Sequence, residues 1–196
     1  MNMPTATSTA DAILRCAHSS IIAGGYNGFS YADIAAVVGV SKANVHHHFA
    51  AKSDLATAVV EQSRAGIQAQ VDRLGHSDLD AAEQLRAYAR YWERCILDGS
   101  APFCIAAMLA AELPSLPDDV AAAVRAFFTD LRAWLTQILV LGREQGNVTL
   151  VGTPEEEADA FLSAVYGAML SARAYGDPRR FAVIVETLLS RVVPFR

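Results

Sequence analysis

The segment that decides the fold lies in the first third of the chain. Residues 29–55 read FSYADIAAVVGVSKANVHHHFAAKSDL. Ser30 stands three residues before Asp33, which is the spacing of a capping box at a helix N-terminus, and Gly39 stops that helix early. Ser41 then caps a second helix that runs into three consecutive histidines. Two short helices across a tight turn are the plan of a helix-turn-helix.

The same kinds of signal occur on both sides of this segment. Ser8 and Asp11 have capping-box spacing, and Gly24 with Gly25 ends the first predicted helix. These signals predict a small three-helix domain over residues 1–55. Four apolar residues at helical spacing are expected to form its core: Ile34, Val37, Val45 and Phe49.

Beyond residue 55 the apolar spacing remains helical, and no stretch predicts a strand with confidence. Helices are expected over residues 52–74 and 103–112, and proline breaks the chain at residues 113–117. Pro154 suits the first turn of a later helix, and the last helix is expected to end near Val193. The prediction is therefore an all-α protein of about nine helices, in which residues 56–196 form a helical bundle.

Composition restricts the possible functions. Of 196 residues, 53% are hydrophobic and 19% are charged, which is typical of a globular chain. A net charge of -5 argues against a protein that coats nucleic acid without selectivity. However, both lysines of the chain, Lys42 and Lys52, lie in or beside the helix-turn-helix, so a local basic surface remains possible there.

The cysteines and the apolar stretches indicate the compartment. Cys16, Cys95 and Cys104 are odd in number and contain no CxxC pair, so neither a disulfide framework nor a zinc site is predicted. The N-terminus lacks the pattern of a signal peptide, and no apolar run is long enough for a membrane span. We expect a soluble cytoplasmic protein without a cofactor. Because no catalytic motif is present, we do not expect an enzyme.

Residues 29–55 resemble the DNA-binding segment of the TetR repressor family. The resemblance combines the helix pattern, the Gly-Val-Ser turn at residues 39–41, the aromatic-rich recognition helix and the Phe-x-x-Lys-x-x-Leu pattern that begins at Phe49. It implies a nine-helix homodimer whose third helix enters the major groove of an operator and whose helices 8 and 9 form the dimer interface. Residues 1–55 would bind DNA, and residues 56–196 would bind an effector and dimerise.

The family motif also implies which residues meet DNA. Asn44 can donate and accept at a base edge, most naturally that of adenine. His46 stands where many relatives carry tyrosine, and Ala51 where a capping side chain is common. Consecutive helical histidines point in different directions, so residues 46–48 predict no metal site. The predicted DNA-binding residues are Ser30, Tyr31, Ser41, Lys42, Ala43, Asn44, His46, His47 and Lys52.

The C-terminal part suggests what controls the protein. Residues 103–112 resemble helix 6 of the electrophile-sensing, N-ethylmaleimide-responsive TetR subgroup, which makes Cys104 a candidate sensor. Arg173 stands where that subgroup has a lysine; it can stabilise a thiolate but cannot form the same amine-assisted link. The alternative is a buried structural cysteine. Effector contacts are expected from Tyr88, Trp92, Phe103, Cys104, Met108, Phe128, Trp134, Tyr166 and Met169.

Residues 160–172 are apolar nearly all round, with small residues at Ser163, Ala164, Gly167, Ala168 and Ser171. A helix of this kind is buried on every side, either at a dimer interface or at the centre of a monomer. Together these features predict a ligand- or redox-responsive repressor of a palindromic operator. The alternatives are a helical enzyme and a protein-interaction regulator without effector-controlled DNA binding.

Overall fold

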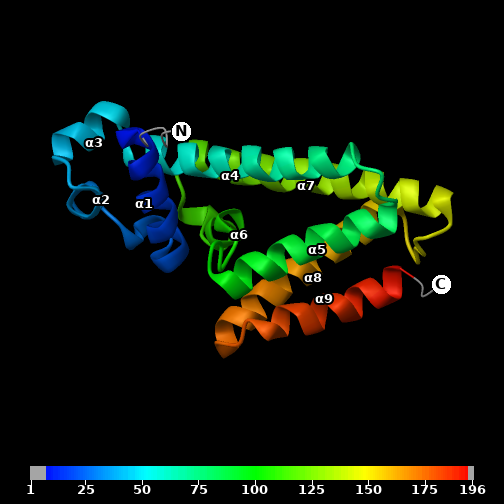
Figure 1. Cartoon of the computed structure of the whole chain (residues 1–196). Coiled ribbons are helices and arrows are strands. Elements are labelled where there is room, and N and C mark those ends of the chain that lie inside the picture. The colour runs from blue at the N-terminus through cyan, green and yellow to red at the C-terminus, as the bar shows by residue number, and fades with distance from the viewer. Residues whose placement is uncertain (1–7, 194–196) are drawn as a thin grey trace, which may run out of the picture. The chain divides into compact units, whose positions relative to one another are not determined.

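The computed structural model describes residues 8–193. Over this span it contains nine α-helices and two short 3₁₀ turns, and no strand (Figure 1). This confirms the predicted all-α class. The elements are α1 (Thr9–Gly24), η1 (Tyr26–Gly28), α2 (Tyr31–Val38), α3 (Lys42–His48), α4 (Lys52–Gly75), α5 (Ala81–Asp98), α6 (Ile105–Ala110), η2 (Leu113–Ser115), α7 (Asp118–Gln145), α8 (Pro154–Tyr175) and α9 (Arg179–Val192).

The predicted caps are present. The Ser30 side chain accepts from the Asp33 amide at 3.3 Å, and the Ser30 amide donates to the Asp33 carboxylate at 2.8 Å. Ser8 begins α1 in the same reciprocal way. Gly39 ends α2 in the left-handed region, with φ of 77°, which glycine adopts without the Cβ penalty of other residues. The starts of α1 and α2 and the end of α2 are therefore determined by residues within one turn of each helix end.

Two expectations about individual elements were wrong. The helix predicted over residues 103–112 is shorter, Ile105–Ala110, because the chain tightens into η2, where Pro114 cannot donate to a helical ladder. Val37 was expected in the core but is 76% exposed. The buried face of α2 is formed by Tyr31, Ile34 and Ala35, and Val37 falls on its flank at 3.6 residues per turn.

The described part of the chain divides into two compact units. Unit 1 comprises the residues up to Arg64 together with Ile105–Phe127, so α6 groups with α1–α3. Unit 2 comprises Ala65–Cys104 together with the residues from Phe128. The long helices α4 and α7 belong partly to each. The completely buried side chains in the core of unit 1 include Ile13, Ile21, Ile34, Val45 and Leu55.

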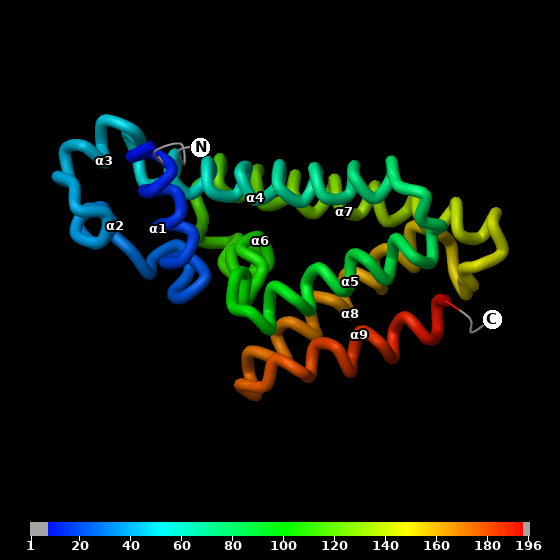
Figure 2. Tube along the Cα trace, viewed as in Figure 1, coloured from blue at the N-terminus to red at the C-terminus, as the bar shows by residue number. Residues whose placement is uncertain are grey.

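In unit 2, α8 and α9 pack against each other, and α9 also packs against α5. The tube trace shows α8 and α9 as neighbouring helices joined by a short turn (Figure 2). The turn begins at Gly176, which caps α8 in the left-handed region. Large side chains on these helices and on α5 and α7 fill the interior: Tyr88, Leu135, Phe161, Met169 and Phe181 are fully buried. Within residues 8–193, no helix has the length and apolarity needed to cross a membrane.

Candidate nucleic-acid interface

The turn between α2 and α3 is held by backbone hydrogen bonds. The amides of Gly39 and Val40 both donate to the Ala35 carbonyl, at 2.9 and 3.0 Å. Ser41 then begins α3 by accepting from the Asn44 amide at 3.1 Å. Val45 is completely buried and anchors α3 to the core of unit 1. The opposite face of α3 is consequently presented to solvent in a fixed orientation.

Most of the predicted DNA-binding residues lie on this surface. Six of them are exposed: Ser30, Ser41, Lys42, Ala43, His46 and His47. Asn44 is half-buried, and its Oδ1 atom is shielded from solvent without a hydrogen-bond partner among the described residues. The Asn44 side chain must therefore turn outward before it can reach a base edge.

Tyr31 has an internal role that sequence reasoning missed. Its side chain is buried, and its hydroxyl lies 2.9 Å from the Phe49 carbonyl and 2.5 Å from the Ala51 carbonyl. The phenol therefore joins α2 to the junction between α3 and α4. Burial, with a smaller contribution from Asp54, raises the pKa of Tyr31 to about 12. The His46 ring packs edge-on against Tyr31, with 4.5 Å between ring centroids.

We expect Tyr31→Phe to lower the free energy of unfolding by about 1–2 kcal/mol, because two carbonyls lose their donor. The folded protein holds the phenol proton more tightly than the unfolded chain. The contribution of the Tyr31 hydroxyl to the free energy of unfolding is therefore complete below the ordinary pKa of 10.0, and it is lost as the pH rises toward about 12. Urea unfolding between neutral and alkaline pH measures both effects. Tyr175→Phe is the control, since Tyr175 is 68% exposed; equal behaviour of the two variants would contradict the assignment.

Lys52 is also engaged inside the fold. Its Nζ donates to the Phe29 carbonyl at 2.7 Å and lies over the rings of Tyr26 and Phe29, 4.8 and 4.5 Å from their centroids. Burial lowers the pKa of Lys52, while Asp33 and Glu112 act in the opposite direction. The flanking aromatic residues are the sequence signal that could have indicated a cation–π contact.

The start of α4 compensates for the missing cap at Ala51. Asp54 accepts a hydrogen bond from the Ala51 amide at 2.8 Å, so half of a capping box remains although Ala51 has no side-chain oxygen.

The histidines of α3 do not gather with other ligands: within residues 8–193, no three His, Cys, Asp or Glu side chains form a group that could hold a metal ion.

Several predicted effector residues meet in the interior of unit 2. The rings of Tyr88 and Trp134 lie 5.3 Å apart, and those of Phe128 and Tyr166 lie 5.2 Å apart. Trp92, Phe103 and Met169 are also buried there. Met108 differs, because it belongs to unit 1. We call Tyr88, Trp92, Trp134 and Tyr166 the aromatic cluster.

The aromatic cluster contains polar groups that are costly to bury. The Tyr88 hydroxyl is within reach of Trp92 and Tyr166, whereas the indole nitrogen of Trp134 is shielded from solvent and has no hydrogen-bond partner among the described residues. Burial raises the pKa values of Tyr88 and Tyr166. All four side chains are therefore neutral near pH 7, and an unsatisfied buried donor costs about 1–3 kcal/mol.

Cys104 lies at the edge of the aromatic cluster. Its Sγ atom is 4.0 Å from the Tyr166 hydroxyl, and the residue is 2% exposed. The next residue, Ile105, begins α6. Arg173 is exposed, and its guanidinium carbon lies 5.1 Å from the centroid of the Phe103 ring. The structure thus places Arg173 beside the residue that precedes Cys104.

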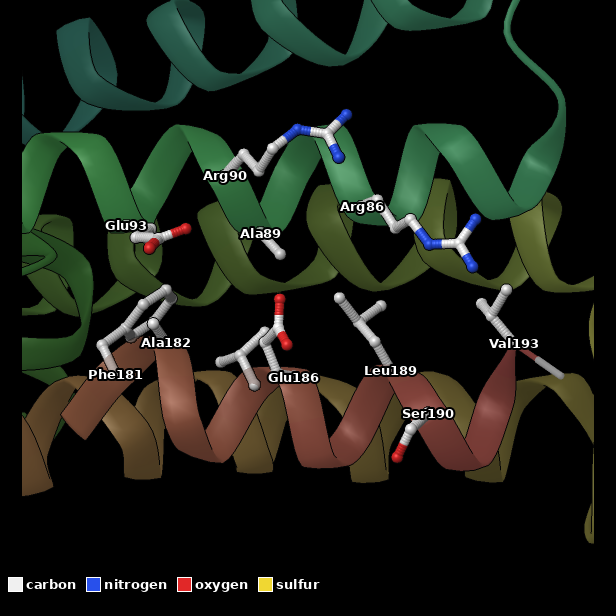
Figure 3. A pocket seen from close by; sticks show the side chains of 11 residues that line it. Arg86, Ala89, Arg90, Glu93, Phe181, Ala182, Glu186, Leu189, Ser190 and Val193 are labelled. Atoms are coloured by element: carbon white, nitrogen blue, oxygen red, sulfur yellow. The ribbon is translucent and has the colours of Figure 1, made fainter. Parts of the chain in front are cut away.

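A separate groove of about 240 Å³ lies between α5 and α9 (Figure 3). None of the predicted effector residues lines it. Ala89, Phe181 and Leu189 give it an apolar floor, while arginines and glutamates stand along its sides. In Figure 3 the Glu186 carboxylate points from α9 toward Ala89 on α5. Charges of both signs therefore face the groove, which favours no single class of ion.

Several exposed positions on α8 and α9 carry small or apolar side chains. On α8, Ala160, Ser163, Gly167 and Leu170 are exposed at helical spacing, whereas the small residue Ala168 faces the core. On α9, Val183 is 68% exposed. We call these exposed positions on the two packed helices the α8–α9 face.

A rigid helix-turn-helix with an exposed second helix, in a chain whose other unit is a helical bundle, defines the class of helix-turn-helix transcriptional regulators. Residues 13–59 match the tetR family of bacterial regulatory proteins, and residues 81–188 match the tetracyclin repressor-like C-terminal domain. The chain belongs to the TetR family.

Individual proteins agree with this assignment. A TetR-family transcriptional regulator from Agrobacterium tumefaciens is 49% identical; the match covers 94% of this chain and 97% of that one, with a TM-score of 0.92. The HTH-type transcriptional repressor NemR of Escherichia coli K12 is 24% identical over 175 residues, 88% of each protein. The structure of reduced E. coli NemR, at 20% identity, covers 96% of this chain and 100% of its own with a TM-score of 0.82, which shows the shared fold.

Proposed function

We propose that this protein is a cytoplasmic repressor that binds a palindromic operator as a homodimer and is released by an electrophile or small-molecule effector. The observation that carries the proposal is the exposed face of α3, fixed by the buried Val45 and by the turn at Gly39. An α-helix presented in this way fits the major groove of DNA. Residues 1–55 would form the DNA-binding domain and residues 56–196 the effector and dimerisation domain.

Within this proposal the residues of α3 have different tasks. Lys42, exposed in the first turn, would contact phosphate, and Ala43, His46 and His47 would line the groove. Asn44 would turn its amide outward to an adenine edge, which would also satisfy its shielded oxygen. Ser30 and Ser41 would contact the backbone beside their caps. The Tyr31 hydroxyl proton is directed to carbonyls, and DNA phosphates only accept hydrogen bonds, so the Tyr31 side chain would support the DNA-binding helices from inside the fold.

The effector site would be built around the aromatic cluster. The buried indole donor of Trp134 has no hydrogen-bond partner among the described residues, which supports an apolar or aromatic ligand that carries a hydrogen-bond acceptor. Phe103, Phe128 and Met169, which belong to the same unit, would add apolar contacts. Cys104 would sense electrophiles and oxidants from this site, with Arg173 stabilising its thiolate.

Dimerisation would use the α8–α9 face. Small side chains at Ser163 and Gly167 allow a second copy of α8 to approach closely, and Leu170 and Val183 supply apolar area. A twofold axis through this face would relate two copies of α3, one from each subunit, as the symmetry of a palindromic operator requires. Effector binding would then shift the population between dimer geometries.

DNA binding is tested with a duplex that the wild-type protein enriches from a random-sequence pool. The affinity for this duplex is measured across a series of salt concentrations. We expect salt-sensitive, selective binding. Lys42→Ala should weaken binding to all sequences and reduce the salt slope by about one. Asn44→Ala should cost about 1–3 kcal/mol and relax selectivity at one base pair. Failure of the wild type to enrich any duplex would shift support to the enzyme or protein-interaction alternative.

Lys52 provides an internal comparison for the same assay. Because its ammonium group is bound to the Phe29 carbonyl and covered by two rings, Lys52→Met tests whether it also contacts phosphate. A salt slope reduced by about one supports the phosphate contact implied by the family motif. An unchanged slope with a lower melting temperature would assign Lys52 to the fold alone.

A further inference from the structure

A carboxylate far away in the sequence is bound to the turn that precedes the helix-turn-helix. Glu112 follows α6, and its Oε2 atom accepts a hydrogen bond from the Tyr26 amide at 3.0 Å, across 86 residues of sequence. Tyr26 is the first residue of η1. Both residues belong to unit 1, in which α6 also packs against α1. The segment after α6 thus holds the connection between α1 and α2.

The chain leaves room for this carboxylate at Gly25. A Cβ atom at Gly25 would lie 1.7 Å from the Glu112 Oε1 atom, so a larger residue is incompatible with the observed position of Glu112. Gly25 also adopts φ of 72° and donates its amide to the Ile21 carbonyl at 2.8 Å. Two properties of Gly25 therefore allow Glu112 to approach closely: its left-handed backbone conformation and its lack of a side chain.

The start of α4 holds the other end of the same turn. Lys52 donates to the Phe29 carbonyl, and the negative charge of Glu112 favours its protonated form. Ser30, which follows Phe29 in the chain, is the N-cap of α2. Residues 25–29 are thus bound at one end by Glu112 and at the other by Lys52, immediately before the helix that orients α3.

We propose that Glu112 is a positioning residue for DNA recognition: without touching DNA, it fixes the turn from which α2 and α3 are directed. The proposal rests on the proposed function. It also names a route for regulation of the same site, because α6 begins directly after Cys104 and Glu112 lies two residues beyond its end. A change at Cys104 that moves α6 would be transmitted to the exposed face of α3 through the Glu112–Tyr26 hydrogen bond.

The test uses four full-length proteins: wild type, Glu112→Ala, Glu112→Gln and, as a matched control, Glu144→Ala, which removes an exposed glutamate from α7. Each is titrated with the enriched duplex and with a scrambled duplex, before and after treatment with N-ethylmaleimide. Hydrogen exchange at the Tyr26 amide reports the hydrogen bond itself. Melting temperatures show that all four proteins are folded at the temperature of the assay.

We expect Glu112→Ala to bind the enriched duplex at least about fivefold more weakly, to bind the scrambled duplex as before, and to exchange the Tyr26 amide faster. Glu112→Gln should retain most of the selectivity, because its amide oxygen can still accept from Tyr26. The weakening caused by N-ethylmaleimide should be smaller in Glu112→Ala than in the wild type. A purely structural role would instead lower the affinity for both duplexes together.

The proposal is overturned if Glu112→Ala discriminates between the two duplexes as well as the wild type and Glu144→Ala do. It is also overturned if both affinities fall in parallel with stability. These results differ from failure of the proposed function, in which the wild type itself enriches no duplex. If only the N-ethylmaleimide response is absent from the wild type, the role of Cys104 is rejected, and the comparison of the two duplexes still decides the role of Glu112.

Discussion

Leu170→Glu is expected to convert the protein into a monomer and to weaken binding to its enriched duplex by about a hundredfold or more. Linked binding sites can gain a factor of about 10²–10⁴ over one site alone, and a monomer loses that gain. Leu170 is 59% exposed on α8. In a symmetric interface each substitution occurs twice, so two carboxylates would be buried without partners.

The neighbouring residues explain why Leu170 is the informative position. Gly167 and Ser163 precede it on the same exposed side of α8, and they leave little side-chain area that could compensate for a buried charge. Val183 adds the matching apolar contribution on α9. A surface of this composition is more apolar than a solvated helix face needs to be.

Sedimentation analysis and duplex titration measure the two effects independently. Val151→Glu is the control, because Val151 is 99% exposed between α7 and α8 and lies outside the α8–α9 face. We expect Val151→Glu to remain dimeric with unchanged affinity. A Leu170→Glu protein that still sediments as a dimer would locate the dimer interface elsewhere, even if its affinity for DNA were lower.

Local signals in the sequence were sufficient for the ends of α1 and α2, although not for those of α6. Ser30 and Asp33 stand in one turn, so their capping interaction depends only on residues three positions apart. The same holds for Gly39, whose left-handed conformation stops α2 wherever the rest of the chain lies. The groove-facing residues of α3 were expected from the resemblance of this segment to the TetR family, and most of them are exposed.

Contacts between distant residues could not be predicted in this way. Tyr31 binds carbonyls 18 and 20 residues later, and Glu112 binds an amide 86 residues earlier. Periodicity places a side chain on a face of its helix but does not say which carbonyl or amide it will meet. Met108 illustrates the same limit, since the sequence grouped it with residues of the aromatic cluster although it belongs to the other compact unit.

Cys104→Ser is expected to abolish the response to electrophiles. In the wild type, N-ethylmaleimide would form a bond between the Cys104 sulfur and one carbon of its double bond, while the thiol proton is transferred to the neighbouring carbon. Cys104 is 2% exposed, and its sulfur lies 4.0 Å from the Tyr166 hydroxyl. An added ring cannot be accommodated there without displacing packed side chains, so we expect operator affinity to fall about tenfold or more.

The other cysteines make this prediction specific. Cys95 is buried at the C-terminal end of α5, and Cys16 is half-buried on α1, where burial raises the pKa of its thiol. The resemblance of residues 103–112 to the electrophile-sensing subgroup assigns the response to Cys104, so Cys95→Ser and Cys16→Ser should respond to N-ethylmaleimide like the wild type, while Cys104→Ser should keep its affinity for DNA. Mass spectrometry identifies the modified cysteine in each case. Release that persists in Cys104→Ser would make Cys104 a structural residue.

Arg173 is expected to influence how fast this modification proceeds. A guanidinium near the sulfur favours the thiolate without itself reacting, and Arg173 already stacks on Phe103, the residue before Cys104. Arg173→Ala should therefore slow the reaction of Cys104 with N-ethylmaleimide, and Arg173→Lys should react at least as fast as the wild type. Because the rate is measured on the protein without DNA, an unchanged rate in Arg173→Ala would exclude a role in activating the thiol, whatever the effect on operator binding.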